Sequence, residues 1–169
     1  MKSLLAVGAA ACLTVACSSM GGGASGPRAI ATVDPTQGNG ARGTVTFTQR
    51  GDDVRVTAEL SGLALDARNG IHVHEKGDCS APDGTSAGGH YNPGGSPHGP
   101  QSGPHHAGDM PNLVTGPYGD AHASFELHGV KVSDLVGRAV VVHRDADDYT
   151  SQPAGNSGPR IGCGVIKAA

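Results

Sequence analysis

The chain has 169 residues, a formal net charge of −3 and no run of basic residues, a composition that excludes an extended nucleic-acid-binding surface. It contains 28 glycines but no tryptophan, two phenylalanines and three tyrosines. Glycine is more than twice as frequent as the average of roughly 7%, which is typical of many turns and long ordered loops and argues against a helical bundle.

The N-terminal segment, residues 1–16, is predicted to be a secretory signal peptide. Lys2 is followed by an apolar run from Leu4 to Ala16. This run is shorter than the roughly 20 apolar residues of a membrane-spanning helix and ends in small residues, as removed leaders do. The sequence therefore predicts export to the periplasm or cell envelope.

Cys17 follows these small residues, where a bacterial lipoprotein is cleaved and acylated. The surrounding sequence resembles a lipobox, with Thr14 where leucine is preferred. An ordinary leader beside an incidental cysteine is the alternative to lipidation. Residues 17–27 are rich in Gly and Ser and are expected to form a flexible tether. Residues 28–169 then have the length of a single folded domain.

A period of two predicts antiparallel strands in this domain. Polar and apolar residues alternate over 44–48 and over 54–60, with a turn at Gly51-Asp52-Asp53 between them. Further strands are expected at 30–33, 70–75, 121–127, 139–143 and 162–167. We therefore predict an all-β fold, a Greek-key β-barrel or sandwich of about eight antiparallel strands with two long loops.

The two long loops are predicted at Lys76–Tyr118 and Arg144–Pro159. The first holds most of the prolines and His90, His98, His105 and His106. A loop of this length is usually disordered or functional, and composition alone favours disorder. Metal ligation by the histidines and an anchoring cysteine would instead order it.

Cys79 and Cys163 are the cysteines of the folded domain. An even pair in an oxidising compartment favours a disulfide, which would constrain the unfolded chain by about 4.5 kcal/mol. A pair of reduced, metal-binding thiols is the alternative.

His72 and His74 are two residues apart on an expected strand, so both imidazoles project from the same face. Such a pair alone is more often solvated surface than a metal site. Three further motifs follow in order: Gly89-His90-Tyr91-Asn92-Pro93, His106-Ala107-Gly108-Asp109 and Gly158-Pro159-Arg160-Ile161-Gly162-Cys163-Gly164-Val165. Together with Gly70-Ile71-His72-Val73-His74-Glu75, they make the chain resemble the copper/zinc superoxide dismutases from about residue 30 to its end.

The resemblance implies two metal sites that share one histidine. The copper ligands would be His72, His74, His90 and His143, and the zinc ligands would be His90, His98, His106 and Asp109. Four imidazoles suit Cu(II), whereas three imidazoles and a carboxylate form a closed tetrahedral zinc site. The motif selects His106 over the adjacent His105. His122 and His128 lie outside the motifs and are expected to be solvated or packed.

The resemblance also implies an enzyme that converts superoxide to dioxygen and hydrogen peroxide. Arg160 would attract and orient the anion, and His90 would leave reduced copper and deliver a proton to the departing peroxide. Cys79 and Cys163 match the disulfide of the family. Asp147 matches a carboxylate that links a copper histidine to a zinc histidine; an ordinary surface carboxylate is the alternative.

One departure from the family concerns the positive charge that attracts superoxide. Eukaryotic members carry lysines in the loop after the last copper histidine, but this chain has none between Arg144 and Arg160. Asp145, Asp147 and Asp148 add negative charge there. A steering field would have to come from Arg160, from the metals or from residues such as Lys76 or Arg144.

Two other functions are compatible with parts of this pattern. A non-catalytic periplasmic copper/zinc store or carrier would need the same histidines but not Arg160. A structural surface lipoprotein with incidental histidines would have no ordered site.

Bacterial members of the family are monomers or homodimers, so either state is expected.

Overall fold

The computed structural model describes residues 26–169. The predicted signal peptide, Cys17 and most of the predicted tether lie outside these residues. The strands are β1 Arg28–Pro35, β2 Arg42–Arg50, β3 Asp53–Ser61, β4 Arg68–Asn69, β5 Ile71–His74, β6 Leu113–Val114, β7 Ala121–Leu127, β8 Ala139–His143 and β9 Arg160–Ala168; two short helices are η1 Thr85–Ala87 and α1 Val132–Leu135. The prediction of an all-β fold is confirmed.

The alternating pattern explains the hairpin of β2 and β3. In β3, Val54, Val56, Ala58 and Leu60 are buried, and the residues between them face outward. Phe47 of β2 pairs opposite Val56, so large apolar side chains of neighbouring strands meet on the inner face.

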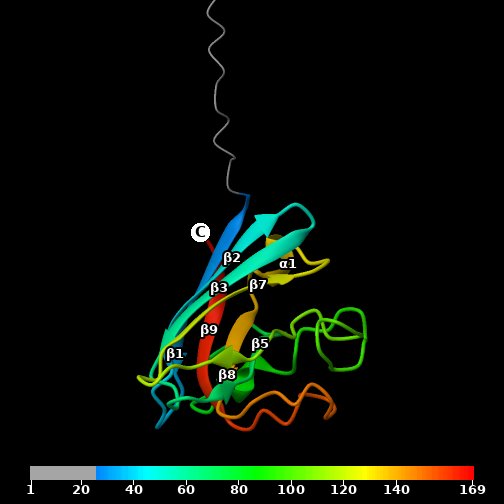
Figure 1. The fold of residues 1–169 in the computed structure, drawn as a ribbon. Coiled ribbons are helices and arrows are strands. Elements are labelled where there is room, and N and C mark those ends of the chain that lie inside the picture. The colour runs from blue at the N-terminus through cyan, green and yellow to red at the C-terminus, as the bar shows by residue number, and fades with distance from the viewer. Residues whose placement is uncertain (1–25) are drawn as a thin grey trace, which may run out of the picture.

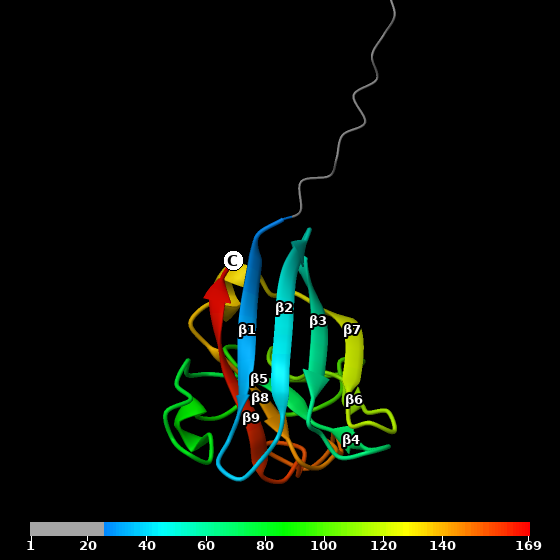
Figure 2. The ribbon, with the colours of Figure 1, turned by 90° about the vertical axis from the view of Figure 1, so that its left-hand side faces the viewer.

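The main sheet has seven strands in the order β5-β8-β9-β1-β2-β3-β7 and curls into a half-barrel around the core (Figures 1 and 2). The chain leaves β3 near one edge, reaches β5 at the other edge, returns to β7 beside β3, and crosses again to β8 beside β5. These crossings are of the Greek-key type. As a result, β9, the last strand, lies in the interior of the sheet between β8 and β1.

The first long loop is ordered because part of it pairs with β5. Val73 donates its N–H to the Gly108 carbonyl at 2.9 Å and accepts from the Tyr91 N–H at 2.8 Å. The other side of β5 pairs with β8, so all four residues of β5 are buried. The loop thus covers an edge that would otherwise expose unpaired backbone groups.

Most of each long loop lies on the side of β5 and β8 that faces away from β1, β2 and β3 (Figure 1). Within residues 26–169, no helix has the length and apolar character needed to cross a membrane.

Candidate metal centre

The predicted ligands come together in two adjoining groups. His72 and His74 lie on the same face of β5, and His143 ends the neighbouring strand β8. His90 is supplied by the first long loop, and its ring stacks on that of His72 at a centroid distance of 4.0 Å. One nitrogen from each of these four rings lies within 4.8 Å of the others.

The second group is built by the first long loop alone. His90, His98, His106 and Asp109 each offer one ligand atom, and these atoms also lie within 4.8 Å of one another. Nδ1 of His90 is 2.8 Å from Oδ1 of Asp109 and 3.4 Å from Nδ1 of His106. His90 therefore belongs to both groups.

Two rings of the first group donate a hydrogen bond from the outward nitrogen to a backbone carbonyl. His74 Nδ1 donates to the Gly88 carbonyl at 2.9 Å, and His143 Nδ1 donates to the Gly158 carbonyl at 3.2 Å. Because the outer nitrogen carries the proton, the inner nitrogen presents a lone pair to the group. This is the tautomer that a metal ligand requires.

Asp147 serves two rings at once and is fully buried, so it is not a surface carboxylate. Its Oδ2 accepts from Nε2 of His72 at 2.7 Å, and its Oδ1 accepts from Nε2 of His98 at 2.9 Å. It thereby joins a ring of the first group to a ring of the second.

Several inward nitrogens are buried without a hydrogen-bond partner among the described residues: His72 Nδ1, His90 Nε2 and His98 Nδ1. His98 Nδ1 lies 3.0 Å from Oδ2 of Asp109 but lacks hydrogen-bond geometry. Unsatisfied buried polar atoms are costly unless something else binds them. Their convergence fits metal ions in both groups.

The surroundings of these side chains shift their pKa values toward the protonation states that metal binding requires. Burial lowers the pKa of His74 to about 2 and that of His143 to about 4, and it also lowers the pKa of His72. Burial raises the pKa of Asp109, but hydrogen bonds from the His90 ring and the His106 N–H outweigh it and lower this pKa to about 2. At neutral pH these three imidazoles are neutral and the Asp109 carboxyl is ionised, as metal ligands must be.

The remaining histidines lie outside both groups. His105 bonds through Nδ1 to the Gly103 carbonyl at 2.6 Å. His122 and His128 are largely exposed, each beside an aspartate.

Comparison with known proteins agrees with this geometry. A family model described as copper/zinc superoxide dismutase matches residues 41–166, about three quarters of the chain. The chain belongs to the copper/zinc superoxide dismutase family.

Curated relatives carry the same family name. A Superoxide dismutase [Cu-Zn] of Deinococcus radiodurans is 38% identical over 143 residues, covering 75% of this chain and 77% of the relative. A Superoxide dismutase [Cu-Zn] of Paramecium bursaria Chlorella virus 1 is 41% identical over 136 residues, covering 74% and 72%. Superoxide dismutase [Cu-Zn] 1 of Aquifex aeolicus is 41% identical over 135 residues, covering 74% and 79%.

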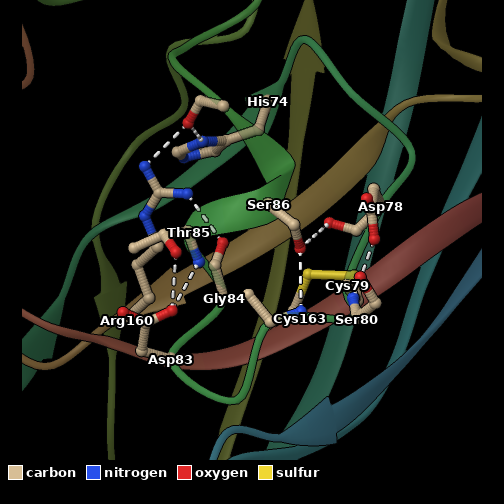
Figure 3. Close-up of a disulfide and its surroundings, with 12 residues drawn as sticks. His74, Asp78, Cys79, Ser80, Asp83, Gly84, Thr85, Ser86, Arg160 and Cys163 are labelled. Carbon is tan, nitrogen blue, oxygen red and sulfur yellow. Dashed lines mark hydrogen bonds between the residues drawn. A yellow bond between two sulfur atoms is a disulfide. The ribbon is translucent and has the colours of Figure 1, made fainter.

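Arg160, which the family resemblance singles out, stands beside the first histidine group. As the first residue of β9 it pairs opposite His143, where the ladder is irregular. Its guanidinium donates to the Gly84 carbonyl at 2.7 Å (Figure 3). It also donates to the Gly88 carbonyl at 2.7 Å. The Gly88 carbonyl oxygen thus accepts hydrogen bonds from both Arg160 and His74. Arg160 also lines a hollow of about 380 Å³ with His74, His90 and His143.

The disulfide expected in this family is present and fixes the segment that holds Arg160. Cys79 and Cys163 are bonded, with their Cα atoms 5.7 Å apart (Figure 3). Gly84, one of the two carbonyl partners of Arg160, lies five residues after Cys79. The disulfide therefore ties β9 to the loop that holds its arginine.

In the loop from 144 to 159, Arg144 is paired with Asp145 and Asp148 is hydrogen-bonded by neutral groups. Arg144 forms two hydrogen bonds of 3.1 Å to the Asp145 carboxylate, so it is not a free source of positive field. Asp148 accepts from the backbone and side chains of Thr150 and Ser151.

The sequence motifs did not indicate three residues that support this centre: Asn112, Gln152 and Gly155. Two act through hydrogen bonds to backbone groups of the other loop, and Gly155 lies against Asp147 and His98. Such long-range backbone contacts leave no periodic or spacing signal in a sequence.

Proposed function

We propose that this protein disproportionates superoxide, with copper held by His72, His74, His90 and His143 and zinc held by His90, His98, His106 and Asp109. Two superoxide anions and two protons yield one dioxygen and one hydrogen peroxide. When bound, copper supplies the one-electron oxidation and reduction. The convergence of unsatisfied ring nitrogens in two groups that share His90 supports this assignment most directly.

Arg160 orients the substrate in this proposal. Two of its N–H groups are fixed on backbone carbonyls, which holds the guanidinium at the wall of the hollow. A fixed cationic fork suits a small anion better than a mobile lysine does. A metal store or carrier would not need this arginine beside its ligands, so the arrangement favours an enzyme.

His90 is proposed to move the proton. Its Nδ1 faces Asp109, and its Nε2 is buried with the first histidine group and has no hydrogen-bond partner within residues 26–169. Nε2 is therefore the atom that would accept a proton and pass it to the reduced product. The four ligands of the second group leave no open tetrahedral position, so its metal would organise the loop and not activate water.

We also propose that the protein acts in the cell envelope. The leader at residues 1–16 would export it, and Cys17 would be acylated. A leader, an acylated Cys17 and the 17–27 tether would hold the folded domain at a membrane surface. The test is to express the full chain and a Cys17→Ser variant and separate membrane from soluble fractions. The wild type should be in the membrane fraction and the variant in the soluble one; identical distributions would contradict lipidation.

The enzymatic proposal is tested by superoxide consumption. Protein loaded with copper and zinc is compared with a His143→Ala variant loaded in the same way, and the metal content of both is measured. We expect rapid consumption by the wild type and loss of activity with loss of copper in the variant. Equal rates would refute the proposal.

A further inference from the structure

The two long loops touch each other around Asp147 and His98. Both side chains are buried, and one belongs to each loop: His98 to Lys76–Tyr118 and Asp147 to Arg144–Pro159. Their side chains meet at 2.9 Å. This contact requires both backbones to be placed accurately, although neither residue lies in a helix or strand.

Asn112 of the first loop holds the backbone of Asp147. The Asp147 N–H donates to Oδ1 of Asn112 at 2.8 Å, and Nδ2 of Asn112 donates to the Asp147 carbonyl at 2.8 Å. A side-chain amide thus satisfies both backbone groups of one residue, as a neighbouring strand would. The Asn112 N–H also donates to the Tyr149 hydroxyl at 2.7 Å.

Gln152 of the second loop makes the reciprocal contact. The His98 N–H donates to Oε1 of Gln152 at 2.9 Å, and Nε2 of Gln152 donates to the His98 carbonyl at 2.8 Å. Each loop therefore contributes one amide side chain that hydrogen-bonds both backbone groups of a residue in the other loop: Asn112 binds Asp147, and Gln152 binds His98. Gln152 is itself exposed, so its packing contributes little to the core.

Gly155 shows how closely the parts fit. Its φ is +66°, and a Cβ at this position would collide with the Asp147 carboxylate and lie 2.6 Å from Nε2 of His98. The second loop thus passes directly over the contact that the two amides align. Little space remains for Asp147 and His98 to adjust if either backbone moves.

We propose that Asn112 and Gln152 are positioning residues that act as a reciprocal pair of amide clamps and set the affinity of the His90, His98, His106 and Asp109 group for zinc. This inference rests on the metal assignment of the proposed function. Because the clamps hold loops, whereas His72, His74 and His143 lie on strands, they should affect zinc much more than copper.

The test measures zinc binding to the metal-free, disulfide-bonded protein by competition with a chromophoric chelator. Gln152→Met and Asn112→Leu remove the clamps with little change in volume. Each should weaken zinc binding about tenfold, at the lower end of what loss of outer hydrogen-bond partners costs a metal site. The double variant should lose less than the product of the single effects, because both clamps align the same contact. Copper affinity should change less than zinc affinity.

Gln37→Met is the matched control, since Gln37 is exposed and its side chain makes no hydrogen bond to any described residue. The thermal unfolding of the metal-free variants is compared with that of this control. Gln152→Met leaves two backbone groups of His98 without their partner, so it should unfold at a somewhat lower temperature than the control, remain folded, and bind zinc more weakly. Zinc affinities within twofold of the wild type in Gln152→Met, or fully multiplicative losses in the double variant, would overturn the clamp proposal. A wild type that binds zinc but does not consume superoxide would refute the proposed function and leave the clamps unaffected.

Discussion

Removing the carboxylate of Asp147 should weaken zinc binding more than copper binding. In Asp147→Ala, the Nε2 groups of His72 and His98 lose acceptors at 2.7 and 2.9 Å in a fully buried position. A hydrogen bond to a charged group contributes about 1.5–3 kcal/mol, and each 1.4 kcal/mol is tenfold in affinity, so the loss at His98 predicts zinc binding about 10–100-fold weaker. His72 retains its place on β5 through the ladder with β8, so copper should be affected less.

Asp148→Ala provides the control, because it removes the same charge one residue away. The Asp148 carboxylate is exposed and bonds only to Thr150 and Ser151 of its own loop among the described residues. Zinc and copper affinities are measured for both variants on metal-free protein by chelator competition at constant pH. Equal zinc affinities in the two variants would show that the buried carboxylate does not position His98.

Other predictions follow from the same centre. Arg160→Glu should slow superoxide consumption at least about tenfold and change its salt dependence while copper stays bound; unchanged kinetics would remove Arg160 from the reaction. The lowered pKa of His143 (about 4) and of His74 (about 2) means that the folded, metal-free protein excludes protons that the unfolded chain binds below about pH 6.5. The free energy of unfolding that these two neutral histidines contribute is therefore fully present above about pH 6.5. It falls on acidification, by about 2 kcal/mol per histidine at about pH 5. Denaturant titrations above about pH 6.5 and at about pH 5 would detect this loss. Gly155→Ala should lower bound zinc and the melting temperature together, because its Cβ would displace Asp147; wild-type zinc content by mass spectrometry would contradict this.

The alternating strands could be predicted from the sequence because their residues report burial directly. Over 54–60, every second residue is apolar and every one of those is buried. The two-residue strands β4 and β6 and the single turn of α1 were not predicted, since segments so short carry no period. The ordering of the first long loop could be predicted only as one of two alternatives, because it depends on pairing with β5, which is distant in sequence.

The family motifs were enough to indicate the ligand residues, but not what holds them. That Asp147 is buried and bonded to two rings depends on where two loops meet. The hydrogen bonds that Asn112 and Gln152 make to backbone groups cannot be predicted from the spacing of residues in the sequence. Arg144 illustrates the same limit for charge, because its pairing with Asp145 was not anticipated.

The interior position of β9 has a consequence for biogenesis. This strand carries Arg160 and Cys163, and it joins β5 and β8 to the rest of the sheet. Before β9 emerges from the ribosome, β5 and β8, which carry His72, His74 and His143, cannot join the sheet of β1, β2, β3 and β7. At that stage the chain would also lack both the arginine and the disulfide. Assembly of the reactive centre is thereby deferred until β9 has been synthesised and has paired between β8 and β1.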